Sequence, residues 1–133
     1  MDVVILVGRI MFSVLFLGAA MGHLIRTDAM ANFAASRGVP QPHAATIVSG
    51  LLIGAGGLMV LLGIWADLGA LFLFFFLMGT TLLVNRFWWE AGEVRMQMQV
   101  QFMKDLALAG ASLMLFAFFT TTDVGFMLTG PLF

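Results

Sequence analysis

Residues 44–84 read AATIVSGLLIGAGGLMVLLGIWADLGALFLFFFLMGTTLLV and decide the fold of this chain. Asp67 is the one charged residue in this stretch, and it lies in a short turn, 64–67, between two long apolar runs. A helix needs about 20 apolar residues to cross the hydrocarbon core of a bilayer. The stretch therefore predicts an antiparallel hairpin of two membrane-spanning helices.

The same apolar pattern extends over most of the chain. Mean hydropathy is +1.06 and only 10% of the 133 residues are charged, which excludes a water-soluble domain because its surface would need more polar side chains. Backbone polar groups in lipid must be satisfied internally, and the run 71–78 lacks the alternation of a barrel strand. We expect a single-domain, all-α integral membrane protein, a four-transmembrane-helix bundle over residues 1–133. The expected spans are residues 3–22, 44–64, 68–84 and 102–119, each approximate.

The two longer connections carry further structural signals. Residues 28–36, between the first two spans, are predicted to form an interfacial helix whose apolar face includes Met30 and Phe33. Trp88 and Trp89 follow the third span, and a tryptophan pair there is typical of a headgroup anchor. Basic residues also gather in these links, which predicts that the links face the cytoplasm and that both termini lie outside. They are Arg26, Arg37, Arg86, Arg95 and Lys104.

Small and aromatic residues indicate how the spans pack. Gly50 and Gly54, together with the small residues of 18–22 and 107–111, have the spacing that lets helices approach closely. The alternative is a groove for a partner helix or a cofactor tail. The third span instead carries bulky rings around its surface, so we expect it to contact lipid or another membrane-protein subunit. Those rings are Phe72, Phe74, Phe75 and Phe76.

Two sets of polar residues lie at membrane depth. Arg9 and Ser13 share one face of the first span, and Arg9 is expected to pair with Asp67 or Asp123, or else to bind an anionic headgroup or a quinone oxygen. A second face, on the last span, should point into the bundle or a wet cavity. The residues of this face either form hydrogen bonds with neighbouring helices, while Lys104 extends to the membrane interface, or they line a polar vestibule that opens to the cytoplasmic side. Its residues are Gln97, Gln101, Asp105 and Ser112.

The polar groups at the link end of the bundle are the strongest candidate for a site. His23 ends the first span and His43 begins the second, on the same side as Arg26, Trp88 and Asp105. Hydrogen-bonding groups beside apolar and aromatic walls are typical of small-molecule sites, so we predict a quinone or lipid headgroup bound by His23, Arg26, Trp88 and Asp105. The alternatives are interfacial histidines without a special role and, less favoured, a haem ligated by both rings.

Composition excludes several chemistries. The chain has no cysteine and no tyrosine, which removes thiolate, iron–sulfur and phenol chemistry, and no metal-ligand spacing is present. Net charge is −1 and there is no basic run, so a nucleic-acid partner is not expected. No catalytic constellation is visible, and the sequence favours a non-enzyme.

Taken together, these features resemble the DoxX family of small four-span bacterial membrane proteins. Ile53 and Asn85 depart from the family pattern, where many relatives have an acidic residue and a histidine, so a proton-coupled or metal role that depends on those groups is not expected here. The matching segments are residues 8–12, 18–23, 33–40, 56–63, 85–88 and 102–108.

The resemblance implies a place in the bacterial plasma membrane and a redox context, because some members are named for a quinone-reducing oxidoreductase. We therefore expect a non-catalytic or quinone-proximal accessory subunit of a larger redox or respiratory complex, with a quinone or a bound lipid as its cofactor. The alternatives are a stand-alone quinone-linked oxidoreductase and a small carrier or lipid-binding protein.

Overall fold

The computed structural model describes residues 1–83, 88, 90–122, 124, 125 and 127, and within them it is all-helical. Four of its helices are long and apolar enough to cross a membrane, which confirms the predicted fold class. The fifth, α2, confirms the short helix predicted between the first two spans. The helices are α1 (Asp2–Ile25), α2 (Thr27–Ser36), α3 (Pro42–Leu62), α4 (Ala66–Leu83) and α5 (Gly92–Thr121).

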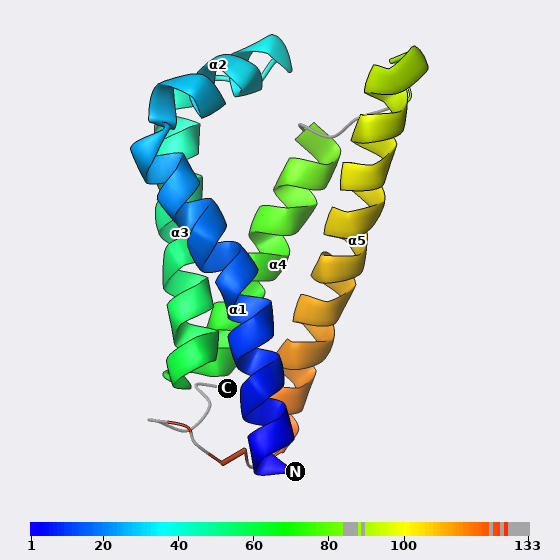
Figure 1. Ribbon diagram of the computed structural model, residues 1–133. Coiled ribbons are helices and arrows are strands. Elements are labelled where there is room, and N and C mark those ends of the chain that lie inside the picture. Colours follow the sequence, from blue (N-terminus) through cyan, green and yellow to red (C-terminus); the bar gives the residue numbers. More distant parts are fainter. Residues whose placement is uncertain (84–87, 89, 123, 126, 128–133) are drawn as a thin grey trace.

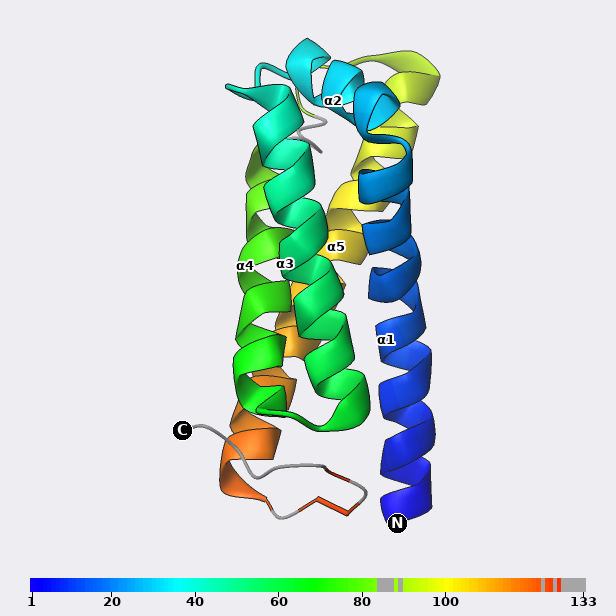
Figure 2. The ribbon, with the colours of Figure 1, turned by 90° about the vertical axis from the view of Figure 1, so that its left-hand side faces the viewer.

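The helices pack in a row in which α1 contacts α3, α3 contacts α4, and α4 contacts α5. Figure 1 shows that the α1–α3 pair diverges from the α4–α5 pair toward one end of the bundle. The short helix α2 packs on α3 and α1 and lies across that end (Figure 2). The bundle is therefore splayed beneath α2.

The last helix extends beyond the predicted span, because α5 begins at Gly92 and the span was expected to begin at about residue 102 or earlier. Residues 92–101 are too polar to register as a span, but most are good helix formers such as Glu, Arg, Met and Gln. Thirty residues rise about 45 Å along a helix axis, and the hydrocarbon core is only about 30 Å thick. The hydropathy boundary thus marks where lipid begins, and the helix starts about three turns earlier.

Glycines in α3 allow its neighbours to approach closely, as predicted. A β-carbon on Gly50 would lie 2.7 Å from the β-carbon of His23 on α1. One on Gly56 would lie 2.9 Å from the carbonyl oxygen of Gly69 on α4. By contrast, a β-carbon on Gly18 or Gly110 would meet no atom within 4 Å, so these two glycines do not serve packing among the described residues.

The phenylalanine-rich helix α4 lies between α3 and α5 and buries one face in the core through Leu73 and Leu77. Of its four phenylalanines only Phe75 is exposed, at 63%. The exposed surface of α4 thus includes Phe75 and, at the end of the helix, Leu82 and Leu83, which are each 53% exposed.

Arg9 holds the other end of the bundle together. Its side chain is 3% exposed, and it donates hydrogen bonds from Nε to the carbonyl oxygen of Val60 at 3.0 Å and from Nη2 to that of Leu61 at 2.8 Å. Both carbonyls belong to the last turn of α3, where they have no partner within the helix. A third bond, from Nη1 to the carbonyl oxygen of Gly125 at 3.3 Å, ties in the C-terminal segment.

The cation of Arg9 also lies at the negative end of the α3 dipole, which favours it there. Asp67 is fully buried at the start of α4, and its pairing with Arg9 stays a prediction, as does that of Asp123, which lies outside the described residues. Ser13 is buried one turn beyond Arg9, and its hydroxyl has no hydrogen-bond partner among the described residues.

Candidate functional site

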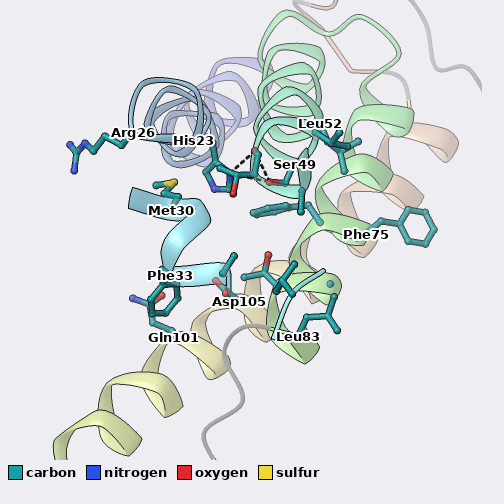
Figure 3. A pocket seen from close by; sticks show the side chains of 18 of the residues that line it. His23, Arg26, Met30, Phe33, Ser49, Leu52, Phe75, Leu83, Gln101 and Asp105 are labelled. Atoms are coloured by element: carbon teal, nitrogen blue, oxygen red, sulfur yellow. Dashed lines mark hydrogen bonds between the residues drawn. The ribbon is translucent and has the colours of Figure 1, made fainter. Parts of the chain in front are cut away.

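A cavity of about 690 Å³ occupies the splayed end of the bundle, and all five helices contribute to its wall. Pockets of 300–1,000 Å³ are typical of sites for small molecules. Most of the lining is apolar, and polar side chains enter it from α1, α3, α4 and α5 and from Arg26 between α1 and α2 (Figure 3). The larger apolar residues of the wall are Met30, Phe33, Val48, Leu52, Phe75, Phe76 and Leu83.

His23 is the polar group most firmly fixed in this wall. Its Nδ1 lies 3.2 Å from the carbonyl oxygen of Thr46 and 3.0 Å from the hydroxyl oxygen of Ser49, both on α3. The close α1–α3 crossing at Gly50 brings the ring within reach of these atoms. The other side of the pocket comes from α4, where Phe76 meets the imidazole edge-on with ring centroids 5.8 Å apart.

Four further polar residues complete the lining, and one of them is Thr80 of α4, which is partly buried. Asp105 of α5 is 9% exposed, which places its carboxylate at the inner part of the wall. Gln101, one turn earlier on α5, and Arg26, between α1 and α2, are exposed. The cavity therefore has a buried acid and an imidazole inside and a cation and an amide nearer to solvent.

The roof of the cavity is α2, whose apolar side faces inward through Met30, Phe33 and Ala34. Its C-terminal end is joined to the segment before α5 by an ion pair between Arg37 and Glu90, with 2.5 Å between Nη1 and Oε1. Because both side chains are partly buried, this pair fixes α2 across the space between the two helix pairs.

Four of the eight polar residues predicted for sites lie together at this cavity: His23, Arg26, Gln101 and Asp105. Trp88 and Lys104 do not line it. Trp88 is exposed, and its ring meets Phe102 edge-on with centroids 5.9 Å apart, while Lys104 is also exposed. Arg9 and Ser13 lie toward the opposite end. Asn85, Arg86 and Trp89 lie outside the described residues.

The second histidine, His43, contacts Asp28 outside the cavity. The Nε2 of His43 lies 3.2 Å from an oxygen of Asp28, and the side chains of both residues are mostly exposed. His23 lines the cavity and His43 does not. This placement does not favour a shared haem, since the two rings do not face one cavity.

Thr46 and Ser49 are site residues that the sequence reasoning missed. They lie one turn apart near the start of an apolar span, at the depth of His23, and beside a glycine. This pattern of small polar residues next to a close helix crossing is the signal that could have found them.

A second cavity of about 490 Å³ lies between α1 and α5 toward the opposite end. It is lined almost wholly by apolar side chains, among them Phe12, Met114 and Phe118. Among the described residues that line it, Arg9 alone is charged. Because the hydrogen bonds described above engage that guanidinium with backbone carbonyls, this cavity has less to offer a polar headgroup.

Comparison with known proteins gives two matches. The profile of the DoxX family matches residues 4–86. The curated relative "Inner membrane protein YphA" of Escherichia coli (strain K12) is 25% identical over 113 residues, which cover 85% of this chain and 81% of the relative. No solved structure matches the chain significantly.

Proposed function

The chain belongs to the DoxX family and is a multi-pass bacterial membrane protein, and we propose that it binds the head of an isoprenoid quinone in the cavity beneath α2 as a quinone-proximal subunit of a membrane redox complex. The observation that carries the proposal is the lining of this cavity. Aromatic and aliphatic walls suit a quinone ring and the first part of its tail, and a few fixed polar groups suit the ring oxygens.

The proposed role is binding and not catalysis. Quinones carry their own redox chemistry, and a protein that holds one supplies position, hydrogen bonds and a low dielectric. His23 and Asp105 are the inner polar groups of the lining that can form hydrogen bonds with the oxygens of the head in its hydroquinone form. With no cysteine or tyrosine, the chain has no thiol or phenol of its own for electron transfer, so electrons would come from a partner subunit.

A phospholipid headgroup is the competing occupant, and Arg26 favours it. An exposed guanidinium at the edge of the cavity suits a phosphate. The buried carboxylate of Asp105 disfavours a phospholipid, because it would repel an anionic headgroup that entered the inner part of the cavity.

Filling the cavity is expected to abolish quinone binding. Gly79 lines the cavity from α4, and a β-carbon there meets no atom within 4 Å, so Gly79→Phe places a ring in the cavity without a backbone clash. We expect the dissociation constant of a short-chain ubiquinone, titrated into protein in lipid nanodiscs, to rise at least about tenfold, which is about 1.4 kcal/mol.

Gly110→Phe is the matched control, because Gly110 is equally open but lies on α5 outside the cavity. It should bind the ubiquinone as the wild type does. Equal binding by all three proteins would refute the proposed site. Titration with phosphatidylglycerol in place of ubiquinone distinguishes the competing occupant.

The accessory role is tested separately by purification in a mild detergent. We propose that a partner subunit packs on the side of α4 that carries Phe75 and that the α2 end of the bundle faces the cytoplasm. A subunit that carries flavin, haem or an iron–sulfur cluster should copurify with the wild type and be lost with Phe75→Ala. Met114→Ala, at an exposed methionine of α5, should retain it. Purification of the chain without any such subunit would contradict the accessory role.

A further inference from the structure

We infer that His23 presents an unprotonated Nε2 to the cavity, so that the site selects a headgroup with a hydroxyl donor, and that the quinone is therefore held in its reduced, hydroquinone form. This inference rests on the proposed function and adds the redox state of the ligand. The structural basis is the pair of contacts that His23 makes with α3.

Those contacts define which ring nitrogen carries the proton. The carbonyl oxygen of Thr46 can only accept a hydrogen bond, and it lies 3.2 Å from Nδ1 of His23. A bare Nδ1 would set two lone pairs against each other at that distance. Because a neutral imidazole has one N–H, a proton on Nδ1 leaves Nε2 with its lone pair.

Ser49 is consistent with the same assignment. Its hydroxyl donates to the carbonyl oxygen of Thr46 at 3.0 Å, which leaves the lone pairs of Oγ to accept from Nδ1 of His23 at 3.0 Å. Both oxygens that face Nδ1 then act as acceptors for it. In the alternative, the Ser49 hydroxyl donates to a bare Nδ1. That arrangement satisfies the contact between Ser49 and Nδ1 but makes the contact between Nδ1 and the carbonyl oxygen of Thr46 repulsive.

The free nitrogen lies on the cavity side of the ring. Nδ1 is turned toward α3, and Nε2 is on the opposite edge of an imidazole that lines the cavity (Figure 3). Nε2 of His23 has no hydrogen-bond partner among the described residues. A ligand in the cavity therefore meets an acceptor at this point and not a donor.

An acceptor discriminates between the two redox forms of a quinone. The oxygens of an oxidised quinone are carbonyls, which only accept, whereas those of a hydroquinone are hydroxyls, which can donate to Nε2. The carboxylate of Asp105, when ionised, is a second group that only accepts. Among the donors of the lining, Arg26 and Gln101 are exposed, so water competes with them. The hydroxyl of Thr80, which also lines the cavity, can either donate or accept and so favours neither redox form.

The tautomer can be observed directly by ¹⁵N NMR at pH 8 on protein labelled only at histidine. The chain has two histidines, so the signals of His43 serve as an internal comparison for those of His23. His23 should show a protonated Nδ1 and a bare Nε2. His43, whose Nε2 lies 3.2 Å from a carboxylate oxygen, should show the reverse. A His23 ring that is protonated at Nε2 would overturn the inference.

Ligand preference is measured with a short-chain ubiquinol, the matching ubiquinone, and the dimethyl ether of the ubiquinol, under anaerobic conditions in nanodiscs. The ubiquinol should bind about five- to tenfold more tightly than either of the others, the effect of one hydrogen bond. His23→Asn keeps a donor near the Nδ1 position and removes the acceptor, so the preference should fall to what the carboxylate of Asp105 alone provides. His23→Gln, whose amide oxygen can reach the Nε2 position, should retain part of it.

The outcomes separate the two proposals. Binding of the ubiquinone as tightly as the ubiquinol would leave the quinone site standing and overturn the selection of the hydroquinone. Binding of neither form would refute both. Tighter binding of phosphatidylglycerol, which also carries hydroxyls, than of the ubiquinol would assign the acceptor to a lipid headgroup and contradict the hydroquinone.

Discussion

Replacing Arg9 with methionine is expected to lower the free energy of unfolding by about 2–4 kcal/mol. The side chain donates to the carbonyl oxygens of Val60, Leu61 and Gly125, and methionine fills a similar volume without a donor. The acceptors are backbone atoms, so no compensating substitution removes them, and each would remain buried without its partner. Unfolding in mixed detergent micelles, followed by circular dichroism, measures the change.

Two further variants test whether the hydrogen bonds from Arg9 to the carbonyl oxygens cause the loss of stability. Arg9→Lys keeps the charge at the end of α3 but lacks the fork that reaches several carbonyls, so about half of the loss should persist. Ser13→Ala removes a buried hydroxyl that has no partner among the described residues and should be neutral or slightly stabilising. If Arg9→Met were as stable as the wild type but bound ligand less well, Arg9 would be a binding residue and not a cap of α3.

Gly56→Ala is expected to destabilise the bundle by about 1–3 kcal/mol. The new methyl group would lie 2.9 Å from the carbonyl oxygen of Gly69 and 3.1 Å from two side-chain carbons of Leu73. The nearest of these is a backbone atom, so α3 and α4 must separate to relieve the clash. The loss persists although alanine is intrinsically the better helix former by about 1 kcal/mol.

The matched control for Gly56→Ala is Gly110→Ala. No atom lies within 4 Å of the added methyl at Gly110, so the helix propensity should act alone and stabilise the protein by up to about 1 kcal/mol. Opposite signs for the same substitution would confirm that the α3–α4 crossing depends on Gly56. Equal effects at the two positions would contradict the close approach of these helices.

Most of the fold could be predicted from the sequence because lipid imposes a strong constraint. Four apolar runs and one amphipathic segment correspond to the five helices, and α2 begins within one residue of its predicted start. The helix α5 begins about ten residues before the predicted span, since hydropathy reports the lipid boundary and residues 92–101 are polar but helical.

The candidate site could be predicted only in part. Helical periodicity placed Asp105 on an inward face, and proximity to the span ends placed His23 at the same level. What the sequence could not supply is the divergence of the two helix pairs, which creates the cavity. Contacts with backbone carbonyls were equally hidden, because a sequence pattern points Arg9 to an acidic side chain, whereas the acceptors that it contacts on α3 are main-chain oxygens.

Extraction of native quinone from the purified protein tests the central claim most directly. We predict that wild-type protein and Gly110→Phe, isolated from membranes in a mild detergent, carry quinone in a near-stoichiometric amount by liquid chromatography and mass spectrometry. Gly79→Phe, with its ring in the cavity, should carry little. Equal quinone in both variants, or none in the wild type, would contradict the claim that the cavity beneath α2 is a quinone site.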